Sequence, residues 1–174
     1  SGRIARHGLD HRDYFRQLTE FEPKRAAGFG IQHYSWICLN AKEAEDLGKA
    51  KEVLAEIPKF LSRPTVLGVG EIGLHKNTPN EAKVFQQQVQ LAIDCFDRSP
   101  SDTCAAGKHH LILIHTPHLE DKLKGTRMIL DMLNDFGSAI DPGRVLIDHG
   151  DEHTIGMVKD TGYWAGMTIY PVSK

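Results

Sequence analysis

Residues 66–74 read VLGVGEIGL, and this stretch decides the fold of the 174-residue chain. The run is nearly continuously apolar up to Glu71, so it predicts a strand over residues 66–72 that is buried on both faces. Such strands are typical of parallel sheets covered by helices. The stretch therefore predicts an α/β fold, with Glu71 at the strand end where such folds place their ligand sites.

Strand and helix patterns alternate outward from this stretch. The strands are expected at residues 31–39, 111–114, 145–147 and 163–170. The helices are expected at residues 13–25, 44–61, 126–136 and 155–158, with a further one that a capping box opens at residues 78–81, TPNE. Pro58 should kink or shorten the helix over residues 44–61. The alternation indicates a (β/α) barrel or a doubly wound sheet, and by itself it does not separate the two.

The composition is that of a globular protein, with 40% apolar and 25% charged residues. A net charge of -2 indicates no broad basic face for nucleic acid, and no apolar run is long enough to span a membrane. Three cysteines without CxxC spacing predict reduced thiols and a cytoplasmic protein. We expect a single domain over residues 1–174, with a loop insertion at residues 98–108 (RSPSDTCAAGK) that has no catalytic role.

Three consecutive predicted strands end in a carboxylate or an imidazole. Glu71 ends the first, His115 ends the second within HTPH, and His149 follows Asp148 at the end of the third. Neighbouring parallel strands lie about 4.8 Å apart, so these side chains can converge on one ion. Because Glu and His are ligands for zinc and similar divalent metals, we predict a metal site of Glu71, His115 and His149, with Glu71 and His149 as catalytic residues.

Other polar residues lie beside this predicted site. His75 and His118 follow the strand ends, where they would face substrate or support the ligands, or would be plain loop residues. Asp148 would orient a ligand or act as an acid or base. Because side-chain alternation directs it to the face opposite His149, it is a weaker candidate for the site than His149. Lys122 and Lys124 are expected to be solvated loop charges.

The chain contains three motifs in this order: GVGEIGL at residues 68–74, IHT at residues 114–116 and DH at residues 148–149. In these motifs and their order, the chain resembles the TatD-related metal-dependent hydrolases, which are TIM barrels of the amidohydrolase superfamily. The resemblance implies a (β/α)8 TIM barrel, of which this chain carries strands 3–7 with their helices. It also implies that Glu71, His115 and His149 ligate one or two divalent ions such as zinc, manganese or magnesium.

The resemblance implies a metal-dependent hydrolase, with a metal-activated water that attacks a phosphodiester, as in a deoxyribonuclease, or another ester or amide bond. The substrate would be a small-molecule or nucleic-acid phosphodiester. The alternative is a non-catalytic scaffold or binding module that retains a partial metal site. The alternative rests on two departures, because the chain lacks the family's His-x-His pair and the last-strand aspartate. A nucleotide-binding protein is a weak third hypothesis, since no GxGxxG or Walker-type loop follows a strand.

The chain length bears on how complete this barrel is. A TIM barrel has about 250 residues, so 174 residues correspond to about five and a half βα units. Five strands would leave two unpaired apolar edges, which soluble proteins avoid. We therefore expect the sequence to be part of a longer protein, unless a partner chain, such as a second copy in a homo-oligomer, covers those edges.

Overall fold

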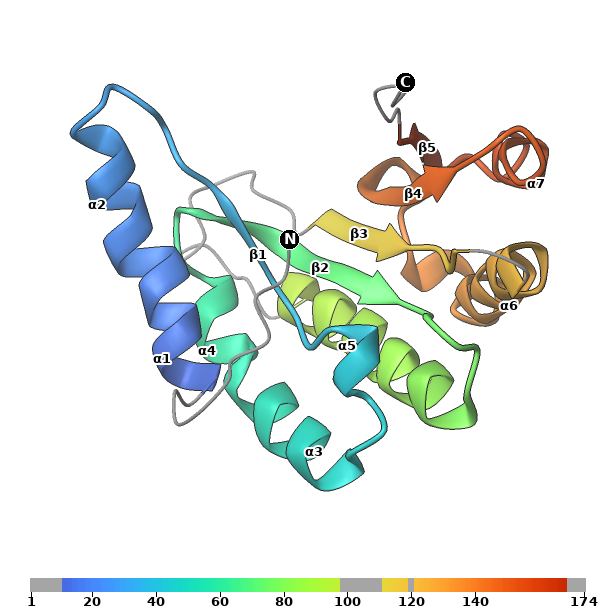
Figure 1. The fold of residues 1–174 in the computed structure, drawn as a ribbon, viewed down its shortest axis with the longest axis horizontal. Helices are drawn as coiled ribbons and strands as arrows, with labels where there is room; N and C mark the ends of the chain where they lie inside the picture. Colours follow the sequence, from blue (N-terminus) through green and yellow to red (C-terminus); the bar gives the residue numbers. More distant parts are fainter. Residues whose placement is uncertain (1–10, 98–110, 119–120, 169–174) are drawn as a thin grey trace, which may run out of the picture.

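The computed structural model describes residues 11–97, 111–118 and 121–168 and contains five parallel strands (Figure 1). The strands are β1 (Ser35–Ile37), β2 (Val66–Gly73), β3 (Leu111–His115), β4 (Val145–Gly150) and β5 (Trp164–Met167). They pair in chain order, from β1 at one edge to β5 at the other. The predicted parallel sheet is therefore confirmed. In the described part of the chain the sheet does not close on itself.

Helical segments precede β1 and separate the consecutive strands. They are α1 (His11–Arg16), η1 (Gln17–Phe21), α2 (Glu22–Ala27), η2 (Ala41–Glu43), α3 (Leu47–Glu56), α4 (Pro58–Leu61), α5 (Pro79–Asp97), α6 (Lys122–Asp135), η4 (Gly137–Ala139), η5 (Pro142–Arg144) and α7 (Ile155–Val158). Pro58 divides the predicted second helix into α3 and α4, as expected. The predicted insertion at residues 98–108 lies outside the described residues.

Several predicted boundaries differ from the structure, and the largest differences are at β1 and α6. Strand β1 is shorter than the predicted residues 31–39, because Ile31 and Tyr34 are exposed and only Ser35–Ile37 pair with β2. Helix α6 begins at Lys122, four residues before the predicted start at residue 126. The only apolar side chain of its first turn, Leu123, is exposed, and a buried apolar period shows from the second turn onward.

The predicted capping box at the start of α5 is present. The Thr78 hydroxyl accepts from the backbone N–H of Glu81 at 3.2 Å, and the Glu81 carboxylate accepts from the backbone N–H of Thr78 at 3.4 Å. The same carboxylate is buried and also accepts from the backbone N–H groups of His75 and Lys76. Glu81 therefore fixes the whole loop that follows β2.

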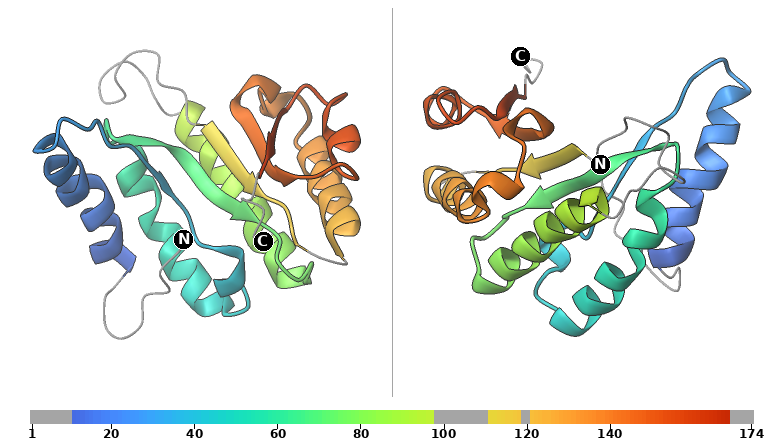
Figure 2. Two further views of the ribbon diagram at one scale, coloured as in Figure 1. Left: turned by 45° about the horizontal axis from the view of Figure 1, so that its top comes forward. Right: turned by 180° about the vertical axis from the view of Figure 1, so that it is seen from behind.

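The core lies between the sheet and its helices. Helices α4 and α5 pack against β2, and α5 also contacts β3, as the view from behind shows (Figure 2). Alternate strand residues are fully buried in this layer, among them Val69, Ile114 and Ile147. Gly68 is required in β2 because a Cβ there would overlap the backbone of Leu111 in β3.

Strand register is irregular at two places that matter for function. The pairing of β2 with β3 shifts between Val69 and Ile72, and the pairing of β4 with β5 shifts between Ile147 and Gly150. Such bulges break the alternation of side chains and redirect individual residues. Both shifts occur at the carboxyl ends of the strands, where the predicted metal ligands lie.

No helix in the described ranges is long and apolar enough to cross a membrane.

Candidate metal centre

Glu71 lies in the bulged part of β2 and is the centre of a small polar cluster. Its Oε1 atom is 3.0 Å from Nδ1 of His115 and 2.7 Å from Nε2 of His149. His115 ends β3, and His149 lies in β4. Three strands thus bring together the three residues predicted as ligands, and a single carboxylate oxygen contacts both imidazoles.

Electrostatics keeps Glu71 ionised. The hydrogen bond with His115 is the largest cause, and with the contact to His149 it outweighs partial burial and lowers the pKa of Glu71 to about 2. The side chain is therefore an anionic acceptor throughout the physiological pH range. An anionic carboxylate between two imidazoles is the donor chemistry that divalent first-row metals prefer.

His149 is held by the segments around it. Its backbone is in the left-handed region, with φ of 62°, and its N–H donates to Oδ1 of Asp148 at 2.7 Å. Its carbonyl accepts from Nζ of Lys122 at the start of α6. Its Nδ1 lies 2.6 Å from the Thr168 hydroxyl, just beyond β5. A partner on one ring nitrogen orients the imidazole so that the other nitrogen faces Glu71.

The interpretation of Lys122 as a solvated loop charge is wrong. Lys122 is the first residue of α6, its side chain is only 15% exposed, and it forms an ion pair with Asp151 at 3.4 Å in addition to its bond to His149. Thr168 was not identified from the sequence at all. No local pattern marks either residue, since both act through contacts with a residue distant in the chain.

Strand alternation predicts that the Asp148 side chain lies on the face opposite His149, and the structure contradicts this prediction. Oxygens of Glu71 and Asp148 and a ring nitrogen of His149 lie within 4.8 Å of one another, an arrangement suited to a metal ion. The physical reason is the register shift between Ile147 and Gly150, which places Asp148 and His149 on the same side.

Of the two histidines expected beside the site, the structure brings His118 close. Its ring centroid is 5.2 Å from that of His115 and 5.2 Å from that of His149. Burial, followed by the neighbouring His115, lowers the pKa of His118 and favours the neutral imidazole. Within the described residues, two groups of side chains have donor atoms within 4.8 Å of one another, namely Glu71–Asp148–His149 and His115–His118–His149. His75 belongs to neither group, and its pKa is also lowered by burial.

Cys38 approaches the cluster from β1 without joining it. Its thiol donates to the backbone carbonyl of Glu71 at 3.3 Å. Burial, helped by the charges of Glu71 and Glu43, raises the pKa of Cys38 to about 12. A thiol that stays protonated is a poor nucleophile at neutral pH.

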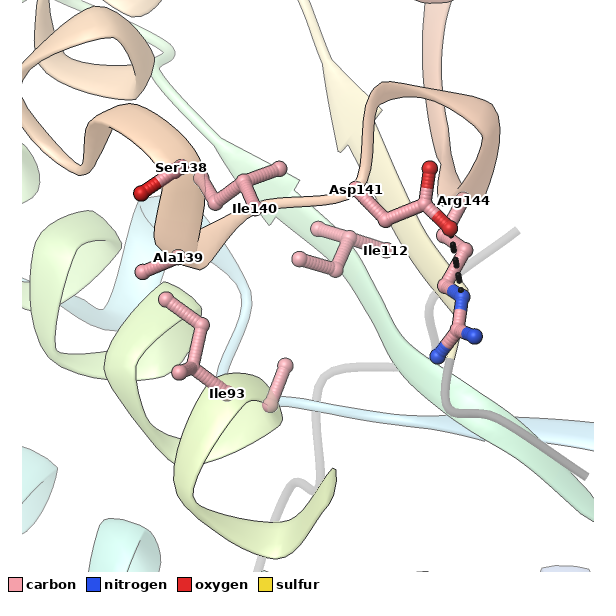
Figure 3. Close-up of a pocket in the computed structure, with 8 residues that line it drawn as sticks. Ile93, Ile112, Ser138, Ala139, Ile140, Asp141 and Arg144 are labelled. Carbon is pink, nitrogen blue, oxygen red and sulfur yellow. Dashed lines mark hydrogen bonds and ion pairs between the residues drawn. The ribbon is translucent and has the colours of Figure 1, made fainter. Parts of the chain in front are cut away.

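Two cavities lie at opposite ends of the sheet. One, of about 190 Å³, has Glu71 in its wall together with Tyr14, Trp36 and Cys38, so one residue of the cluster lines it. The other, of about 200 Å³, lies where β3 and β4 begin (Figure 3). Arg144 and Asp141 face each other at its rim at 3.0 Å. Ligand sites of parallel α/β folds form at the carboxyl ends of strands, which favours the cavity beside Glu71.

Comparison with known proteins addresses the family. No family model matches the chain. An uncharacterized metal-dependent hydrolase of Methanocaldococcus jannaschii is 28% identical over 169 residues, which are 95% of this chain. The crystal structure of a TatD-like protein from Archaeoglobus fulgidus superposes with a TM-score of 0.65 at 29% identity over 91% of this chain. The resemblance to TatD-related proteins is confirmed.

The TatD-like structure also decides between the two architectures left open above. The fold is of the TIM-barrel type, and its five parallel strands form an open arc in the described part of the chain. The chain spans 57% of the length of the M. jannaschii relative and 58% of that of the A. fulgidus protein.

Proposed function

We propose that this TatD-related chain provides the divalent-metal site of a hydrolase, with Glu71, His115 and His149 as its ligands. The observation that carries the proposal is the single Glu71 oxygen within 3.0 Å of ring nitrogens from both histidines. The donor set matches such an ion, because it combines an anionic carboxylate with two imidazoles. When bound, a divalent ion supplies Lewis acidity that makes water nucleophilic at neutral pH and polarises the bond to be cleaved.

The protein residues have distinct tasks in this proposal. Glu71 supplies a full negative charge at neutral pH, because its pKa is lowered to about 2. Thr168 and Asp148 orient the ring and the backbone of His149, respectively. The cavity beside Glu71 offers space for substrate, with the Tyr14 and Trp36 rings for its organic part. We propose a phosphodiester as the substrate class and a cytoplasmic location.

The test combines metal content with turnover. We expect protein purified without chelators to contain a stoichiometric divalent ion by plasma mass spectrometry, and to hydrolyse bis(p-nitrophenyl) phosphate in a metal-dependent way. Glu71→Gln should lose most of both properties, because it removes the shared anionic ligand. Glu152→Gln is the matched control, since the Glu152 side chain is 79% exposed and forms an ion pair with the exposed His153.

The possible outcomes separate the parts of the proposal. No bound metal, together with unchanged rates in Glu71→Gln, would reject the metal site. Metal-dependent cleavage of lactones or amides but not phosphodiesters would reject the substrate class alone. Stoichiometric metal without turnover of any of these substrates would favour the non-catalytic binding module.

A further inference from the structure

We propose that His118 is an additional metal ligand, so that three imidazoles and Glu71 surround one transition-metal ion. This inference rests on the proposed metal site. The ring centroids of His115, His118 and His149 form a nearly regular triangle with sides of 5.2, 5.2 and 4.8 Å. One ring nitrogen from each of the three lies within 4.8 Å of the others.

The Glu71 carboxylate links this triangle to the rest of the site. Its Oε1 atom contacts the ring nitrogens of His115 and His149, which are two corners of the triangle. His118 adds a third imidazole to these two, with one ring nitrogen within 4.8 Å of a nitrogen of each, while the donor atom of Glu71 is grouped in the same way with those of Asp148 and His149. Four donors of this kind match the tetrahedral coordination that zinc adopts.

The chain segment that carries His118 is held in place on both sides. Thr116 is buried, and its hydroxyl donates to the backbone carbonyl of Asp148 at 2.8 Å, which ties the end of β3 to β4. Pro117 restricts the backbone and packs against α6 so closely that a Cβ on Gly125 would overlap its ring. His118 is itself exposed, but its approach to the other two imidazoles is built by buried neighbours.

The composition of the donor set predicts which metal binds. Imidazoles suit zinc, cobalt and nickel, whereas magnesium prefers oxygen ligands and retains its waters. A site of three histidines and one glutamate therefore favours Zn²⁺ or Co²⁺ over Mg²⁺. With Glu71, Asp148 and His149 alone, two of three ligands would be carboxylates, and discrimination against Mg²⁺ would be weaker.

The experiment measures metal binding directly on the metal-free protein. Calorimetry with Zn²⁺ and Mg²⁺ gives the affinities, and the visible spectrum of the Co²⁺ form reports the ligands. We expect His118→Ala to weaken Zn²⁺ binding by at least about 10-fold and to change the Co²⁺ spectrum, with Mg²⁺ binding little affected. His153→Ala is the matched control, because His153 is a 71% exposed histidine that contacts Glu152. Circular dichroism would verify that both variants stay folded.

The outcomes for different variants are distinguishable. Unchanged Zn²⁺ affinity and an unchanged Co²⁺ spectrum in His118→Ala would overturn the role of His118. If His115→Ala and Glu71→Gln still lost binding in that case, the proposed metal site would stand without it. If none of the three substitutions affected binding, the proposed function would fail as well.

Discussion

At the scale of single residues, the arrangement of His149 depends on groups from several segments. Its backbone has a positive φ, which is uncommon for a residue with a side chain. The N–H of this strained residue donates to Asp148, and its C=O accepts from Lys122. The ring is oriented separately, through Nδ1 and the Thr168 hydroxyl. Support of the backbone and orientation of the ring can therefore be tested independently.

We predict that Thr168→Val weakens Zn²⁺ binding by about 10-fold, because the ring of His149 loses the partner that orients it. Thr168→Ser keeps the hydroxyl and should bind as the parent does. Calorimetric titration of the metal-free proteins provides the measurement. Equal affinities for the valine and serine variants would show that the contact at 2.6 Å has no positioning role.

A second prediction concerns the reactivity of Cys38. Its pKa of about 12 keeps the thiol protonated at neutral pH. Because the thiolate is the nucleophile, iodoacetamide at pH 8 should leave Cys38 largely unmodified, whereas an ordinary thiol reacts. The rate of Cys38 alkylation should keep rising about tenfold per pH unit beyond pH 9. This pH range lies above the usual thiol pKa of about 8.5. Peptide mass spectrometry after timed labelling measures both. A rate that levels off near pH 9 would contradict the raised pKa.

At the scale of elements, the buried side chain of Gln88 supplies hydrogen-bond partners to backbone groups beyond a strand end. Beyond the end of β1, the N–H and C=O of Leu39 have their hydrogen bonds with the side-chain amide of Gln88 in α5, at 2.7 and 3.1 Å. Gln88 is 1% exposed, so these groups have no access to water. One amide thus joins the first βα unit to the helix of the second.

We expect Gln88→Leu to lower the free energy of unfolding by about 2–3 kcal/mol, since it leaves a buried donor and a buried acceptor without partners. Gln90→Leu on the same helix is the control, because the Gln90 side chain is exposed and bonds to Asp94 on the same helix, and it should change stability by less than about 0.5 kcal/mol. Urea denaturation of the metal-free proteins measures both. Similar losses in the two variants would refute the role given to Gln88.

The contact between α6 and Pro117 gives another prediction for this scale. Gly125→Ala should destabilise the protein by about 1–3 kcal/mol, because the added Cβ overlaps the ring of Pro117 and Oδ1 of Asn77. Gly156→Ala in α7 meets no atom within 4 Å and should be neutral or slightly stabilising. Thermal unfolding of the two variants makes the comparison. A neutral Gly125→Ala would mean that α6 does not hold the HTPH segment.

At the scale of the whole molecule, the open sheet is the dominant feature. Strands β1 and β5 each have a neighbour on one side only within the described residues, as the two edges of the sheet in Figure 1 show. Large apolar side chains are exposed close to both edges, including Ile31 at 60%, Trp164 at 66% and Met167 at 56%. Unpaired apolar edges promote association between chains.

We therefore predict that the 174-residue chain, produced alone, self-associates at micromolar concentration. Met167→Lys places a charge on the β5 edge and should shift the population toward monomer, whereas Gln90→Lys on the outer face of α5 should not. Size-exclusion chromatography with light scattering gives the mass. A parent chain that is monomeric at all concentrations would contradict the prediction.

The order of elements and the polar residues that meet at the strand ends were accessible from the sequence. The apolar run of β2 predicts a strand covered on both faces, and the predicted helix break at Pro58 is present. Glu71, His115 and His149 were selected because each ends a strand, and parallel strands bring such ends together. Local pattern suffices for these inferences, because burial and backbone geometry repeat with a fixed period.

The tertiary structure alone decided how the site is completed. Two register shifts redirect Glu71 and Asp148, and alternation along an isolated strand cannot anticipate a shift that depends on its neighbour. Thr168 reaches His149 across 19 positions of sequence, and His118 completes its triangle only because Thr116 and α6 hold the turn. Sequence periodicity thus determined which strand ends carry the clustered carboxylate and imidazoles, whereas packing between strands and helices decided which other side chains reach them.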